Sequence, residues 1–285
     1  MKKNIISIIM CCILIGTTHQ PINAQKAPLV QSEIYEEKGQ IILDSVSLTN
    51  NDGAVGISNT TNLIQAKQIS QQLQDPQIQS VLSDYMENDR TPIGIGWTRV
   101  YFDGEGDTID DVPMTVNEME EYKKSNFVKA MVQGKSTTYG YNFTLYTIVG
   151  YDNWNPSITY ADSVAEWSLG SAGKNGPSYT DDDFITMSWP KGFVLLTSGL
   201  SGGTNQYKKK EAYSSVVWGF EEKVGKTILM TTGKNDNSSV TRKWVSDYVH
   251  TWGETTPSFE ISLSGISVSL SSSSMSWQVA SSLVY

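Results

Sequence analysis

Cysteine and histidine are scarce in this sequence. It has two cysteines, Cys11 and Cys12, and two histidines, His19 and His250, among 285 residues. Of these four residues, only His250 lies beyond residue 24. Removal of the first 24 residues would leave a chain without a disulfide, a thiolate metal site or a cysteine nucleophile. Such a chain must be stabilised by a packed core, and one histidine excludes a zinc site built mainly from histidines.

Basic residues are in the minority. The chain has 21 Lys and Arg against 30 Asp and Glu, which gives a formal net charge of −9. Nucleic-acid binding and strong attraction to anionic lipids both require an excess of basic side chains. We therefore expect an acidic protein that does not bind nucleic acid.

The first residues have the pattern of an export signal. Lys2 and Lys3 precede an apolar run from Ile5 to Gly16, and Ala24 is a small residue at a suitable cleavage position. The run is too short for a membrane-spanning helix, which needs about 20 residues. We therefore expect a secreted, extracellular protein that is cleaved after about Ala24.

Beyond the signal, composition divides the chain into three parts. The polar residues 25–59 predict a flexible arm or propeptide-like leader. Residues 60–134 predict a helical N-terminal portion with one strand and an acidic loop, and residues 135–285 predict a β-rich domain. Because no helices separate the strands of the last part, an antiparallel β-sandwich or barrel-like domain is favoured over a parallel sheet. The predicted class is mainly β, α+β overall, with short helices before the strands.

Hydrophobic periodicity and turn residues locate the individual elements. Helices are expected near residues 63–73 and 78–86, and a capping-box pattern, Thr115 to Glu118, predicts a third. The expected strands after residue 135 are 139–149, 158–169, 184–189, 193–197, 214–220, 227–232, 240–251, 259–270 and 275–285.

The sharpest catalytic motif is Gly199–Gly203, which matches the G-x-S-x-G pattern of a nucleophile elbow. Ser201, then Asp236 or Asp247, then His250 follow the chain order of a Ser–Asp–His hydrolase. The segment after the motif is polar and carries three consecutive lysines, unlike the helix that follows such an elbow. A plain glycine turn is the competing interpretation, and Ser201 and His250 remain the catalytic candidates.

An acidic loop follows an expected strand in the first half of the chain. Asp103, Glu105 and Asp107 alternate with glycines, and oxygen ligands at such spacing suit Ca²⁺, which takes six to eight oxygens. These three residues are the candidate calcium ligands, and a solvated acidic loop is the competing interpretation. Carboxylates here or at residues 181–183 would also serve glycoside hydrolysis if they faced each other across a cleft.

Two aromatic residues lie in the turn YDNWNP, where core packing does not explain them. Tyr151 and Trp154 would there be available to stack on a sugar or to lie at a membrane interface.

The C-terminal stretch 258–285 alternates serine with apolar residues, a pattern that would also suit the wall of a pore. The apolar positions change from odd to even numbers at Gly265 and return to odd numbers at Met275. A continuous strand cannot keep both sets on one face. We therefore predict two short strands in a bulged hairpin packed on the core, rather than a membrane-spanning strand.

These observations predict a secreted, non-enzymatic effector or binding protein that acts on membranes or cell surfaces, as toxins and antimicrobial proteins do. Two alternatives remain. One is a secreted hydrolase that uses Ser201 with His250, or a carboxylate pair, and the other is an extracellular structural or adhesion module. The expected partners are a membrane, a cell surface or a carbohydrate, and calcium is the one cofactor that the sequence suggests.

Overall fold

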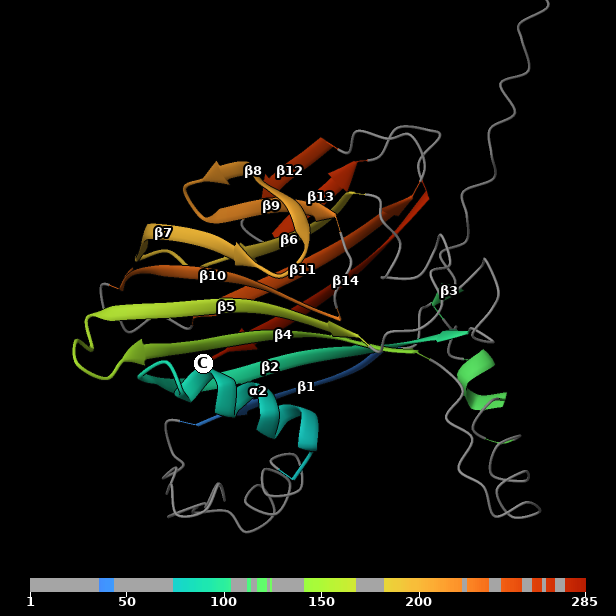
Figure 1. The fold of residues 1–285 in the computed structure, drawn as a ribbon, viewed down its shortest axis with the longest axis horizontal. Coiled ribbons are helices and arrows are strands. Elements are labelled where there is room, and N and C mark those ends of the chain that lie inside the picture. Colours follow the sequence, from blue (N-terminus) through green and yellow to red (C-terminus); the bar gives the residue numbers. More distant parts are fainter. Residues whose placement is uncertain are drawn as a thin grey trace, which may run out of the picture. The chain divides into compact units, whose positions relative to one another are not determined.

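The computed structural model describes residues 36–43, 74–103, 112–113, 117–121, 124, 141–167, 182–221, 225–235, 242–252, 258–262, 265–269 and 275–285. They all belong to one unit, Ile34–Tyr285. Most of them are antiparallel strands in two main sheets (Figure 1). The expected export signal and the expected helix near residues 63–73 lie outside the described residues.

The larger sheet has the strand order β1-β2-β4-β5-β10-β7, and β3 pairs with β2. Its strands are β1 (Glu36–Ile42), β2 (Arg90–Asp103), β3 (Val112–Pro113), β4 (Tyr141–Asp152), β5 (Ile158–Trp167), β7 (Phe193–Ser201) and β10 (Lys226–Asn235). All of their pairings are antiparallel.

The smaller sheet has the strand order β14-β11-β6-β9-β8. Its strands are β6 (Asp182–Ser188), β8 (Thr204–Ala212), β9 (Ser215–Glu221), β11 (Lys243–Trp252) and β14 (Met275–Val284). A separate hairpin consists of β12 (Ser258–Ser262) and β13 (Gly265–Ser269).

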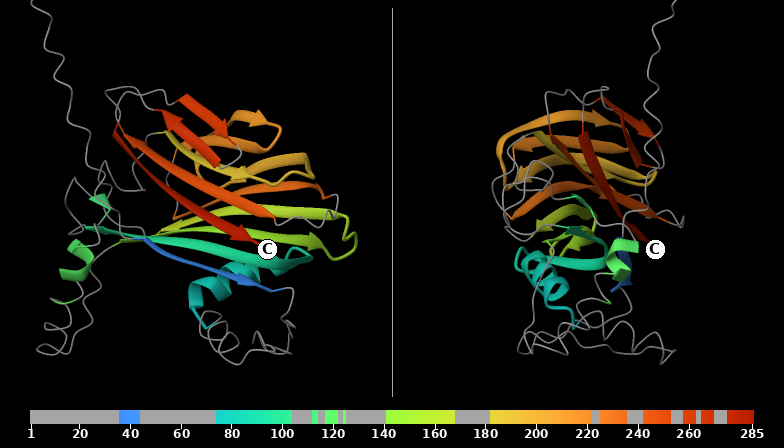
Figure 2. Two further views of the ribbon diagram at one scale, coloured as in Figure 1. Left: turned by 180° about the vertical axis from the view of Figure 1, so that it is seen from behind. Right: turned by 90° about the vertical axis from the view of Figure 1, so that its right-hand side faces the viewer.

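The two sheets pack face to face in a sandwich-like arrangement, seen from two further sides in Figure 2. The core between them is aromatic: Phe143 of β4 lies 4.7 Å from Tyr248 and 5.1 Å from Trp277, measured between ring centroids. Strand β5 shows the alternation that builds this core, since Ala161 and Ala165 face it. Asp162 and Val164 on the same strand face the opposite way.

Helix α2 (Pro76–Met86) covers part of the outer face of the larger sheet (Figure 1). Asp75 caps its N-terminus by accepting hydrogen bonds from the backbone N–H groups of Gln77 and Ile78, and Pro76 suits the first helical position. The buried residues of the helix recur at helical spacing: Ile78, Val81, Leu82 and Tyr85. They form a second core with the outward residues of β2, β4 and β5.

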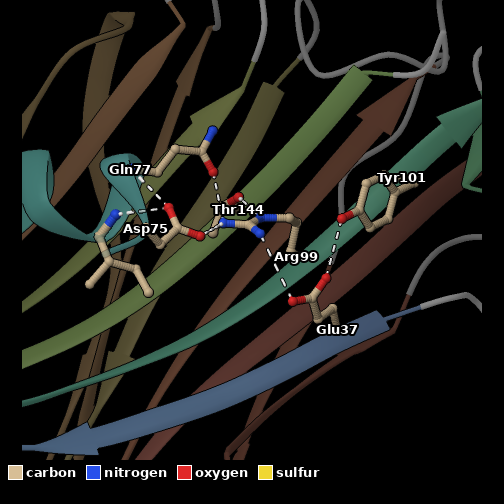
Figure 3. Close-up of polar contacts among 7 residues, drawn as sticks. Glu37, Asp75, Gln77, Arg99, Tyr101 and Thr144 are labelled. Atoms are coloured by element: carbon tan, nitrogen blue, oxygen red, sulfur yellow. Dashed lines mark hydrogen bonds and ion pairs between the residues drawn. The ribbon is translucent and has the colours of Figure 1, made fainter. Parts of the chain in front are cut away.

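Arg99 of β2 ties the start of α2 to the sheet (Figure 3). Its Nη2 donates to Asp75 Oδ2 at 3.0 Å and to Gln77 Oε1 at 2.8 Å, and its Nε donates to Thr144 Oγ1 at 3.4 Å. Burial lowers the pKa of Arg99, whereas the hydrogen bond and charge of Asp75, together with Tyr101 and Tyr146, raise it, and the net pKa is raised. On β1, Glu37 lies 4.0 Å from Arg99 Nη1, so the cluster joins helix and sheet.

Most of the expected elements are confirmed. The helix over 78–86 is α2, and residues 117–121 are helical with Met119 buried. The strand expected over 259–270 is the hairpin β12–β13, and the change of phase marks its turn rather than a bulge, since Ser262 pairs with Gly265. Within β14, the odd positions Trp277, Val279 and Leu283 face the core as the phase predicts.

Two strands differ from the expectation. Strand β1 lies within the segment expected to be an arm, and it pairs along its length with β2. Strand β8 is not among the strands expected from the sequence, because its segment is polar. It is instead the outer strand of the smaller sheet, and its residues are exposed or half-buried, so it shows no apolar alternation.

Candidate functional site

The structure places Ser201 and His250 in different sheets. Ser201 is exposed at the end of β7 in the larger sheet, whereas His250 is wholly buried in β11 of the smaller sheet. After Ser201 the chain turns into β8 through Gly202 and Gly203, whose φ angles are +86° and +74°. These values favour glycine, so the motif supplies the tight turn between the two sheets.

His250 belongs to a buried polar cluster. Its Nδ1 lies 2.6 Å from Asp183 Oδ1, and the Tyr248 hydroxyl donates to Asp183 Oδ2 at 2.6 Å. Burial raises the pKa of Asp183, although His250 and Tyr248 act to lower it. The side chains of His250 and Asp183 have 0% exposure, so neither presents surface to a substrate, and the cluster joins β11 to β6. Asp183 lies in the acidic run 181–183, but only the strand register reveals its partner.

The other candidates from the sequence are spread over the fold. Asp247 is buried in β11, where Thr186 Oγ1 and Gln278 Nε2 donate to its carboxylate at 3.3 and 3.1 Å. Asp103 ends β2, and its backbone pairs with Val112 of β3.

The remaining candidates, Asp236, Glu105 and Asp107, lie outside the described residues. Within the described part of the chain, no group of three or more His, Cys, Asp or Glu side chains is placed to hold a metal ion. The calcium hypothesis therefore remains a prediction about the acidic loop.

The β4–β5 turn presents a tryptophan to solvent. Asp152 Oδ1 accepts hydrogen bonds from the backbone N–H groups of Trp154 and Asn155, both at 2.8 Å, and Asp152 Oδ2 accepts one from the Tyr160 hydroxyl at 2.9 Å. The hydrogen bond from Tyr160 and those from the turn N–H groups lower the pKa of Asp152. The turn is thus fixed on both sides, while the Trp154 side chain is 83% exposed.

Three further large apolar residues are exposed at the same end of the sheets. They are Tyr213 (80%), Val194 (59%) and Leu196 (54%), and with Trp154 they form what we call the aromatic end. Strand register places the start of β7 at the same end as the β4–β5 turn, because Ile158 beside that turn pairs with Lys234, which pairs with Val194.

Tyr213 lies in the β8–β9 turn. The indole N–H of Trp189, which lies just before the start of β7 in the chain, donates to the Tyr213 carbonyl at 3.0 Å and so holds this turn near the start of β7. In Figure 1 the β4–β5 turn, the β8–β9 turn and the start of β7 all lie at the left.

Charges at the aromatic end are of both signs. Lys191 and Lys234 are exposed, and so are Asp89 and Glu211. Asp89 lies beside the β4–β5 turn, where its carbonyl accepts a hydrogen bond from the Asn153 N–H. With the Asp152 carboxylate in the β4–β5 turn, the end carries charges of both signs with a small acidic excess.

A pocket of about 130 Å³ lies beside α2, over the outer faces of β5 and β10. Its central polar group is Asp162, whose Oδ2 lies 2.6 Å from Arg90 Nη1 and whose Oδ1 is buried without a partner among the described residues. The Arg90 guanidinium lies 5.4 Å and 4.2 Å from the ring centroids of Tyr85 and Tyr160. Burial raises the pKa of Asp162 to about 6, and Arg90 offsets this only in part. Asp162 is therefore the side chain in this pocket whose charge is most sensitive to pH near neutrality.

Among the described residues, none of the helices is both long and apolar enough to cross a bilayer. The sequence matches no protein-family model, and no curated protein is similar enough to be a recognisable relative.

Proposed function

We propose that the protein is a secreted, non-enzymatic effector that binds the surface of phospholipid membranes through its aromatic end. The observation that carries this proposal is that the four most exposed large apolar side chains of the described structure gather at one end of the two sheets. Exposed apolar surface that is gathered in one place marks a site of interaction.

The chemistry of the aromatic end favours a membrane as the partner. Trp and Tyr prefer the headgroup level of a bilayer, because their rings are apolar and their polar atoms remain hydrated. Val194 and Leu196 add aliphatic surface beside the rings. The local charges are of both signs and the chain is acidic, so the favoured surface is zwitterionic, with phosphatidylcholine as the simplest example.

The turn that carries Trp154 is preorganised for this role. Asp152 fixes two N–H groups of the turn, and the Asn153 N–H is bonded to the Asp89 carbonyl. A ring presented on such a turn loses little conformational entropy on binding. An aromatic side chain carries roughly 200 Å². Burial of half of the exposed Trp154 surface would therefore contribute about 2 kcal/mol, a factor of about thirty in the partition coefficient.

Flotation with phosphatidylcholine vesicles tests the proposal. The wild-type protein is expected to float with the vesicles, Trp154→Ser is expected to bind about thirtyfold more weakly, and a second change, Tyr213→Ser, is expected to weaken binding further. Tyr101→Ser is the matched control. It also removes an aromatic ring, but from the end of β2 that lies away from the aromatic end. Wild-type protein that stays with the dense fraction, or equal binding by all variants, would refute membrane binding through this end.

Release of a trapped dye separates binding from pore formation. Part of the serine-rich stretch forms the short separate hairpin β12–β13, so its serine pattern does not require a long pore-lining strand. We therefore expect vesicles to bind the protein and remain intact. Export is tested separately by mass spectrometry of the culture medium, where the proposal expects a chain that begins at Gln25.

A further inference from the structure

Two sheets have four outer strands, and each needs some protection against pairing with another chain. An outer strand has one row of unpaired N–H and C=O groups, which proteins shield by charged residues, by coverage or by bulges. Here the outer strands are β1 and β7 of the larger sheet and β14 and β8 of the smaller sheet.

Two of the four strands carry charges. Strand β1 contains Glu36, Glu37 and Lys38, and strand β8 contains the run Lys208–Lys210. Charged side chains on an outer strand disfavour its pairing with another chain. Both strands are therefore protected by sequence.

Strand β14 is uncharged but covered. The Gln40 amide of β1 imitates a neighbouring strand, because its Oε1 accepts from the Val284 N–H at 3.1 Å and its Nε2 donates to the Val284 carbonyl at 3.4 Å. Thr98 Oγ1 of β2 donates to the Ala280 carbonyl at 2.7 Å. Gly96 allows this close approach, because a Cβ there would lie 2.0 Å from the Ser282 carbonyl oxygen. The sheets thus cover each other along this side.

Strand β7 has neither charges nor coverage by a described strand, and its bulge near Leu196 leaves residues 197–201 regular. Its sequence, FVLLTSGLS, has no charge and no proline, and no described strand lies beyond it on the side away from β10. The register with β10 shifts near Leu196 and is regular from Thr197 to Ser201. Both ends of this regular stretch are exposed, and a Cβ added to Gly199 at its centre meets nothing within 4 Å.

We propose that β7 pairs antiparallel with β7 of a second copy of this chain, which extends the larger sheet across two molecules. A second copy is the partner that the strand fits, because two-fold antiparallel pairing closes the interface and brings only uncharged residues opposite each other. Pairing of β7 with β1 of another copy would instead leave further outer strands free and expose β7 to charges. A single strand pair is small for an interface, so the dimer forms at micromolar concentrations.

Sedimentation equilibrium of the full chain, from low micromolar to several hundred micromolar, tests the pairing. The wild type is expected to show a reversible monomer–dimer equilibrium. Gly199→Lys places two lysines opposite each other at the two-fold axis and is expected to weaken the dimer about fivefold. Gly199→Glu is expected to do the same, and an equimolar mixture of the two variants is expected to dimerise again.

Ser83→Lys, on the exposed face of α2, is the matched control and is expected to dimerise as the wild type does. Because an added side chain at Gly199 has open space, both variants should fold, which circular dichroism checks. A wild-type chain that stays monomeric throughout would overturn the proposal. So would a dimer that both charged variants form as well as the wild type, or a mixture that dimerises no better than either variant alone.

Discussion

Replacement of Asp162 by Asn tests whether burial or the ion pair with Arg90 has the larger effect on the pKa of Asp162, in the pocket beside α2. The Asp162 side chain is 5% exposed, and its one charged partner there is Arg90 at 2.6 Å. Burial favours the neutral carboxyl group, whereas Arg90 and a backbone N–H favour the carboxylate. Since the net effect raises the pKa from 3.8 to about 6, burial outweighs the ion pair. The variant removes this titration and leaves an amide of similar shape facing Arg90.

The sign and size of the effect follow from linkage. Between pH 3.8 and 6 the folded protein binds more protons at Asp162 than the unfolded chain does, so the free energy of unfolding falls as the pH rises through this window. The full contribution is about 3 kcal/mol, of which roughly 2.5 kcal/mol falls between pH 4 and pH 7. Asp162→Asn lacks this loss. Its stability relative to the wild type should therefore increase by roughly 2.5 kcal/mol over that range.

Urea denaturation of both proteins, from pH 4 to pH 7 at one ionic strength, measures this difference. Asp152→Asn is the control. The hydrogen bond from Tyr160 and those from the turn lower the pKa of Asp152 from 3.8, so most of its effect on stability falls below about pH 4, and the difference between this variant and the wild type should change little from pH 4 to pH 7. A flat difference curve for Asp162→Asn would show that Arg90 and burial balance, and one that falls with pH would show that Arg90 stabilises the carboxylate by more than burial destabilises it. Either result would contradict the raised pKa.

Three other predictions concern the candidates from the sequence. His250→Ala should lower the free energy of unfolding by about 3 to 5 kcal/mol in urea denaturation at pH 7, because it removes the imidazole partner of the wholly buried Asp183 and leaves Tyr248 as the side-chain donor to it. If the acidic loop binds calcium, millimolar Ca²⁺ should raise the melting temperature of the wild type but not of Asp103→Asn with Asp107→Asn, and an unmoved wild-type value would end that hypothesis. Ser201→Ala should leave vesicle flotation unchanged, and an ester hydrolysis that disappears in this variant would favour the hydrolase alternative.

Helix α2 and most strands could be predicted because their apolar residues follow one period. Strand β8 could not, because an outer strand with both faces exposed or half-buried has no apolar alternation. Strand β1 could not be predicted either, since only Ile41 of its seven residues is buried and its partner β2 lies far along the chain. In both cases the sheet, rather than the local sequence, determines the strand.

The candidate site residues were likewise predictable only where the local sequence determines their surroundings. Trp154 stands out in the sequence because a turn gives it no core to enter, and the structure leaves it exposed. Val194 and Leu196 read as residues of a buried strand, and only the sheet order shows that β7 is an outer strand. The partnership of Asp183 with His250 depends on the pairing of β6 with β11, which no local pattern encodes.

Quenching of tryptophan emission by brominated phosphatidylcholine tests membrane binding through the aromatic end most directly. Trp154 is 83% exposed, whereas Trp97, Trp167, Trp189 and Trp277 are 5 or 6% exposed. Bromine in the acyl chains should therefore quench Trp154 in bound wild-type protein. In Trp154→Phe, which keeps an aromatic ring for binding, this quenching should disappear while the protein still floats with the vesicles. Equal quenching in the two proteins, or none in the wild type, would contradict the proposed orientation on the membrane.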